Sequence, residues 1–187
     1  MSTYQYIPLD LTQRVFRLVR LFPVAQATDV PRCKINLAKL DQRERRYDAL
    51  SYVWGDPNVT RDVKIVLPDD TEKTFRVTEN LFAALVALRH QNKSRVLWID
   101  AICIDQANLD ERSHQVQRML DIYQQARGVV VWLGLEPTAA TESLTGAVDK
   151  CISNKHSNLP KQYVKSFAQF LEADWFYRIW VSVGIAS

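Results

Sequence analysis

Two short segments hold most of the side chains that could do chemistry. Residues 51–56 carry a hydroxyl group, the aromatic rings of Tyr52 and Trp54, a glycine and a carboxylate. Residues 100–106 carry the carboxylates of Asp100 and Asp105 and an amide. Polar groups beside aromatic faces are typical of sites for small ligands, so together the segments could hold a nucleotide-like or sugar-like molecule.

Simpler structural interpretations of the same residues stay open. Asp100 and Asp105 flank an apolar run, and aspartates in tight loops often only accept hydrogen bonds from the backbone. Arg112 could merely pair with Asp105 at the surface, an interaction worth about 0–1 kcal/mol. Tyr52 and Trp54 alternate with Ser51 and Val53 along a strand, so their rings could be buried in the core.

Other candidate sites are weaker. Cys103 and His114 could form a nucleophile and a base, as in a cysteine hydrolase, but Cys103 lies between two isoleucines, which favours a buried, inert thiol. Cys151 and His156 lack the paired spacing of a zinc site, so we predict no metal. The sequence contains neither of the common glycine-rich phosphate loops.

Composition limits the class of protein. The 187 residues are 47% apolar, with 24 Lys and Arg against 21 Asp and Glu, which favours one globular domain with a real core. Basic and acidic residues interleave, so we predict no nucleic-acid partner. The longest dense apolar run, residues 129–135, is too short to span a membrane, and three widely spaced cysteines fit a reducing compartment. We therefore expect a cytoplasmic protein.

The first half of the chain predicts mostly strands. Residues 15–21 form a strand with Arg17 and Arg20 facing water, and residues 33–37 form a second strand. Residues 23–31 connect the two, and residues 41–46 form a solvated turn. Residues 63–66 and 74–77 flank a turn and predict a hairpin.

From residue 47 the pattern alternates strands with helices. Strands are predicted at residues 47–54 and 96–99, and Thr78 caps a helix that runs to about His90. Asn108 and Glu111 indicate a capping box, and the apolar residues that recur at helical spacing after it are Leu109, Val116, Met119, Leu120 and Tyr123. Residues 129–133 are typical of a strand buried on both faces. Helices follow at about 139–153, 161–172 and 175–185, with a flexible connection at 154–160.

This alternation predicts an α/β fold. Its centre is a mainly parallel sheet flanked by helices, with extra antiparallel N-terminal strands and a hairpin. Because ligands bind beyond the carboxyl ends of parallel strands, residues 51–56 and 100–106 are expected to share one site there. The helix start at Asn108 could favour an anionic group.

Three blocks of this sequence resemble those of the fungal heterokaryon incompatibility (HET) domain. Residues 47–56 resemble its opening block, and residues 97–106, continued through 108–134, resemble its long central block. Trp175, Phe176, Arg178, Trp180 and Val181 resemble the start of the third block. The resemblance implies a single domain over residues 1–187, with residues 1–46 as an N-terminal strand extension.

The HET resemblance implies a role in fungal nonself recognition, where the domain triggers programmed cell death after incompatible cells fuse. HET domains are distantly similar to TIR domains, which implies a TIR/flavodoxin-like fold and NAD as a possible substrate, with no bound cofactor. The implied ligand-binding residues are Ser51, Tyr52, Trp54, Gly55, Asp56, Gln106, Arg112, Arg178 and Trp180. The candidate catalytic residues are Asp100, Asp105 and Glu111.

One departure from the family concerns catalysis. The third block usually continues Trp-Val-x-Gln-Glu, but Val183 and Gly184 stand at the last two positions here. A glutamate there could stabilise the oxocarbenium-like species formed when the nicotinamide bond breaks, and glycine cannot. The alternative is therefore a domain without enzymatic activity, which signals by self-association or by binding a nonself-recognition partner protein.

Overall fold

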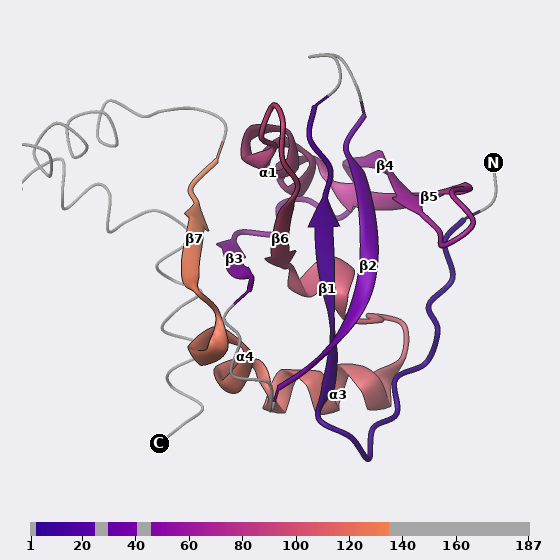
Figure 1. Ribbon diagram of the computed structural model, residues 1–187, viewed down its shortest axis with the longest axis vertical. Helices are drawn as coiled ribbons and strands as arrows, with labels where there is room; N and C mark the ends of the chain where they lie inside the picture. The colour runs from indigo at the N-terminus through magenta and orange to yellow at the C-terminus, as the bar shows by residue number, and fades with distance from the viewer. Residues whose placement is uncertain (1–2, 25–29, 41–45, 135–187) are drawn as a thin grey trace, which may run out of the picture. The chain divides into compact units, whose positions relative to one another are not determined.

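A seven-stranded mixed sheet forms the centre of the computed structural model, which describes residues 3–24, 30–40 and 46–134 (Figure 1). The strand order is β5-β4-β2-β1-β6-β3-β7. In chain order the strands are β1 (Val15–Leu21), β2 (Arg32–Lys39), β3 (Asp48–Tyr52), β4 (Thr60–Val66), β5 (Glu72–Thr78), β6 (Arg95–Trp98) and β7 (Gly128–Trp132). These elements belong to one compact unit, Met1–Trp132.

The prediction of a mainly parallel sheet is wrong. Antiparallel pairs join β1 to β2, β1 to β6 and β4 to β5, and they hold most of the paired residues. Parallel pairs join β2 to β4, β3 to β6 and β3 to β7. Since the sheet is mostly antiparallel, the TIR/flavodoxin-like arrangement is not confirmed, although the strand at 33–37 and the hairpin are.

The position of β1 explains why the prediction failed. Val15, Phe16, Val19 and Leu21 are all buried, so apolar side chains point to both faces of this strand. A strand of that kind is stable only in the middle of a sheet, with layers on both sides. Thus β1 lies between β2 and β6 rather than at an added edge, and it makes the sheet mixed.

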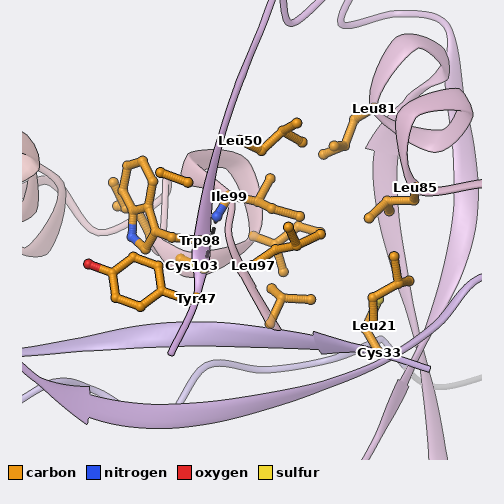
Figure 2. Close-up of a cluster of buried hydrophobic side chains, with 14 of the residues drawn as sticks. Leu21, Cys33, Tyr47, Leu50, Leu81, Leu85, Leu97, Trp98, Ile99 and Cys103 are labelled. Atoms are coloured by element: carbon orange, nitrogen blue, oxygen red, sulfur yellow. Dashed lines mark hydrogen bonds between the residues drawn. The ribbon is translucent and has the colours of Figure 1, made fainter. Parts of the chain in front are cut away.

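Helix α1 (Glu79–Leu88) covers one part of the sheet. The Thr78 hydroxyl oxygen accepts a hydrogen bond from the backbone N–H of Leu81, which confirms the predicted cap. Figure 2 shows Leu81 and Leu85 pointing toward leucines of the strands, among them Leu50, and all three side chains are fully buried. This packing supplies the apolar burial that holds the helix in place.

The second helical region contains α2 (Asp100–Cys103), α3 (Leu109–Gln117) and α4 (Met119–Gln125). Near Arg118, which caps the end of α3, the expected continuous helix divides in two. Among the predicted apolar residues, Met119 and Tyr123 pack against the core. Leu109, Val116 and Leu120 instead remain 65%, 52% and 69% exposed, because the helix turns Glu111, Gln115 and Ile122 inward.

Strand β7 is not buried on both faces, as its β-branched sequence had suggested. Val129 and Val131 are exposed, whereas Val130 and Trp132 pack against the core. Among the described strands β7 pairs with β3 alone and ends the order of the sheet, so one of its faces and one of its edges lack a described neighbour.

Arg17 does not face water, as the sequence had suggested, but is 2% exposed. Its Nη1 donates to Glu111 Oε1 at 2.5 Å and its Nη2 donates to Glu111 Oε2 at 3.0 Å. A strand buried on both faces cannot turn Arg17 and Arg20 to the same side, since they lie an odd number of residues apart. Arg20 takes the solvent side, and Arg17 therefore requires a buried partner.

Several expected elements fall outside the described residues. They are the last three helices, the connection at 154–160, and most of the turn at 41–46. Within the described residues, no helix is both long and apolar enough to cross a membrane.

The stability of this fold should depend on acid pH. Burial raises the pKa of Glu111, but hydrogen bonds from Arg17 and from the N–H of Asp105 outweigh it and leave the pKa below its usual range. Asp48, bonded to Arg127 and Arg95, has its pKa lowered against burial in the same way. A lowered folded-state pKa gives stabilisation that is complete above the unfolded-state pKa and is lost as pH falls through the folded value.

We predict that the free energy of unfolding falls steeply below about pH 5. Urea denaturation at pH values from 7 to 3 measures it. Glu111→Gln should lower stability at pH 7 and make the pH dependence shallower, because one of these two carboxyl groups is gone while Asp48 still titrates. Glu79→Gln, at an exposed position on α1, is the control and should leave the profile unchanged. A Glu111→Gln profile as steep as that of the original chain contradicts the prediction.

Candidate functional site

The carboxyl ends of three adjacent strands define the candidate site. β6, β3 and β7 run parallel to one another, so their ends lie at one edge of the sheet. Residues 53–56 leave β3 there, and residues 99–106 leave β6 there. Ligands of parallel sheets characteristically bind at this kind of edge.

One hydrogen bond brings the two predicted segments together. Trp54 Nε1 donates to Asp100 Oδ2 at 2.9 Å. The other carboxylate oxygen, Oδ1, accepts from the N–H of Ala101 at 2.8 Å, and Asp100 is 9% exposed. Trp54 is half-buried beside this carboxylate and packs against the hydrophobic core.

The loop after α2 is closed by its own polar groups. Gln106 Nε2 donates to the backbone oxygen of Asp100 at 3.0 Å. Asp105 Oδ1 accepts from the N–H of Ala107 at 3.2 Å, while the N–H of Asp105 donates to Glu111 Oε1 at 2.8 Å. Asp105 and Gln106 thus shape the loop, and Asp105 accepts a backbone hydrogen bond as the simpler interpretation had allowed.

Sequence reasoning missed Asn80, which links two strand ends. Its Nδ2 donates to the backbone oxygen of Val53, and its Oδ1 accepts from Trp132 Nε1 at 2.9 Å. The available signal was an asparagine in the first turn of α1, two residues after the Thr78 cap, where its amide competes for backbone groups. Trp132, expected in the core, is half-buried and points its N–H at this amide.

Gly55 lies where only glycine fits well. Its φ angle is +79°, and a Cβ atom built there would lie 3.3 Å from the Cβ of Asn80. Because Gly55 has no side chain, the backbone of the turn after β3 can lie close to Asn80 at the start of α1.

The remaining predicted ligand residues are dispersed. Ser51 is half-buried in β3, and Tyr52, at 2% exposed, belongs to the hydrophobic core. Asp56 is exposed and accepts hydrogen bonds from Asn58 in its own turn. Arg112 is exposed on α3. Arg178, Trp180, Val183 and Gly184 lie outside the described residues.

Glu111 is enclosed rather than open to a ligand. It is 1% exposed, and both carboxylate oxygens accept from Arg17. As predicted, Asn108 Oδ1 accepts from the N–H of Glu111, at 3.1 Å. The reciprocal half of a capping box is absent: the Glu111 carboxylate reaches Arg17, and the N–H of Asn108 donates to the backbone oxygen of Asp105 instead.

Cys103 does not have the properties of a nucleophile. Its side chain is 1% exposed, and burial raises the pKa of the thiol to about 12. The thiol is therefore protonated at neutral pH, as expected of an inert buried cysteine. The described residues contain no cluster of His, Cys, Asp and Glu able to hold a metal ion.

Residues 47–183 match the family model of the heterokaryon incompatibility protein (HET). The chain belongs to the HET family. Both site segments lie within the matched residues of this HET domain, as the resemblance of its sequence blocks had indicated.

A curated relative supports the same assignment. Heterokaryon incompatibility protein 6, OR allele, from Neurospora crassa, is 37% identical over 140 residues. The alignment covers 71% of the HET chain and 20% of the relative, so the chain spans about a fifth of that protein's length. No solved structure matches the chain.

We predict that Gly55→Ala lowers the free energy of unfolding by about 1–2 kcal/mol, the cost of a left-handed backbone for an L residue. The contact with Asn80 adds to it. Gly128→Ala is the matched control, since Gly128 has no positive φ and a Cβ added to it would meet no atom within 4 Å. Urea denaturation compares the two variants, and equal stabilities would contradict the role assigned to Gly55.

Proposed function

We propose that this HET domain acts in fungal nonself recognition and triggers programmed cell death when incompatible cells fuse. Membership of the HET family supports the role, and so does the name of the Neurospora relative. We further propose that the domain binds a nucleotide of the NAD type at the carboxyl ends of β3 and β6.

The hydrogen bond between Trp54 and Asp100 is the observation that carries the proposed ligand. It places the indole of the half-buried Trp54 beside a carboxylate at the parallel edge of the sheet. An aromatic face can stack on a nicotinamide or adenine ring. Each carboxylate oxygen can accept more than one hydrogen bond, and the proposed ribose hydroxyl would donate to Asp100 beside the indole N–H of Trp54.

In this proposal the domain binds NAD but cleaves it poorly. The resemblance to NAD-cleaving TIR domains assigns catalysis to a glutamate in the third block, where this chain has Gly184. Without that carboxylate, positive charge that develops on the ribose lacks its stabilising partner. Signalling by this chain would then depend on the NAD-bound form of the domain, or on another HET protein that has the third-block glutamate.

We predict measurable NAD binding by isothermal titration calorimetry. Asp100→Asn should weaken it about tenfold, because the variant can still accept from Trp54 but loses the charge and an acceptor. Asp62→Asn, at an exposed position on β4, is the control and should bind like the original chain. Val183→Gln combined with Gly184→Glu should yield nicotinamide release that the original chain lacks. If neither the folded chain nor this double variant binds NAD, the proposed ligand is wrong.

A second candidate function is self-association or binding of a partner protein. Leu109, Val116 and Leu120 lie seven and four residues apart on α3 and α4, and all are more than half exposed. Exposed apolar side chains that group on one surface commonly mark interaction sites. The exposure of these three side chains supports a signalling module that has no enzymatic activity.

We predict for this candidate that the chain sediments as a dimer or larger species at high concentration. Combining Val116→Ser with Leu120→Ser should shift it to monomer, since the substitutions remove apolar area from the contact. Val86→Ser, at an exposed apolar position of α1, is the control and should leave the distribution unchanged. Analytical ultracentrifugation measures the oligomeric state, and a strictly monomeric original chain contradicts self-association.

A further inference from the structure

An N-terminal strap, residues 3–9, lies outside the part of the chain that matches the HET family and yet contacts the site loop. The N–H of Tyr4 donates to the backbone oxygen of Thr74 on β5 at 2.9 Å. The Tyr6 hydroxyl donates to the backbone oxygen of Ile102 in α2, also at 2.9 Å. The strap is thereby held both to the sheet and to the helix that begins at Asp100.

Arg17 joins the strap, the loop and α3 at one point. Besides its two bonds to Glu111, its Nη1 donates to the backbone oxygen of Cys103 at 3.1 Å, and its Nη2 donates to that of Ile7 at 2.7 Å. The guanidinium group also lies over the ring of Tyr6, 4.7 Å from the centroid. A planar fork of donors is what allows one side chain to meet acceptors on three segments.

The groups that Arg17 holds are those that shape the loop after Asp100. Cys103 is the last residue of α2, and Glu111 accepts from the N–H of Asp105. Fixing these two points fixes the direction in which α2 leaves β6. The position of the Asp100 carboxylate toward Trp54 follows from that direction.

Stability alone does not require such an ion pair. Desolvation of two buried charges offsets most of their attraction, and apolar residues of similar volume often stabilise a core as well or better. A buried Arg–Glu pair does specify geometry, because its hydrogen bonds are satisfied in one arrangement only.

We propose that Arg17 is a positioning residue for the HET site, acting through Cys103 and Glu111 on the α2 loop, with the N-terminal strap enclosing it. The effect on ligand affinity rests on the proposed function; the effect on the loop does not. The family-matched residues would then need the preceding strand and strap to present Asp100 correctly.

The experiment replaces the ion pair by apolar residues, Arg17→Met with Glu111→Met, in the full chain. Amide hydrogen exchange of residues 100–108 and NAD affinity by calorimetry are the readouts, and thermal denaturation checks the fold. We expect a folded variant whose loop amides exchange at least about tenfold faster and whose affinity falls about tenfold. Arg14→Met with Asp121→Met removes an exposed pair, 2.6 Å apart, and should change neither readout.

A folded double variant with unchanged loop exchange overturns the proposal. If the double variant does not fold, Arg17→Lys tests the proposal instead. Lysine retains the charge for Glu111 but cannot reach the backbone oxygens of Cys103 and Ile7 together. Faster amide exchange of the loop is therefore again expected in the folded variant. If the original chain binds no NAD, the proposed function fails, while the exchange rates of residues 100–108 still decide whether Arg17 positions the loop.

Discussion

The buried ion pair between Arg17 and Glu111 constrains the rest of the described structure. Both side chains are almost fully enclosed, and neither charge can remain there without the other. Strand β1 must therefore lie in the register that presents Arg17 to α3, and α3 must turn its polar side inward. The exposed leucines and valine of α3 and α4 follow from the same requirement.

The sheet has two regions, one that is largely antiparallel and one that is parallel. β1, β2, β4 and β5 pair largely antiparallel and carry the ion pair's arginine on a strand buried on both faces. β6, β3 and β7 pair in parallel, and polar side chains tie their carboxyl ends together: Trp54 to Asp100, and Asn80 to both Val53 and Trp132. The site is thus held by Trp54 in the turn after β3, Asn80 on α1 and Trp132 on β7, together with the α2 loop.

Local signals in the sequence predicted local features well. The cap at Thr78 and the hairpin each depend on a few neighbouring residues, so the sequence near them is sufficient. The inward side of Arg17 was not predictable in that way, because its partner lies 94 positions along the chain. The prediction of a mainly parallel sheet was wrong for a similar reason. Alternation of strands and helices does not show where an N-terminal strand is inserted in the sheet. Asn80 was missed because both of its partners are distant in sequence.

The central claim is that residues from two HET blocks form one ligand site at the ends of β3 and β6. A titration of NAD into ¹⁵N-labelled protein, followed by nuclear magnetic resonance, tests it most directly. We predict that the indole N–H signal of Trp54 and the backbone amides of residues 100–106 shift together, with a common affinity. Shifts confined to other residues, or no shift of the Trp54 indole at saturating NAD, would contradict it.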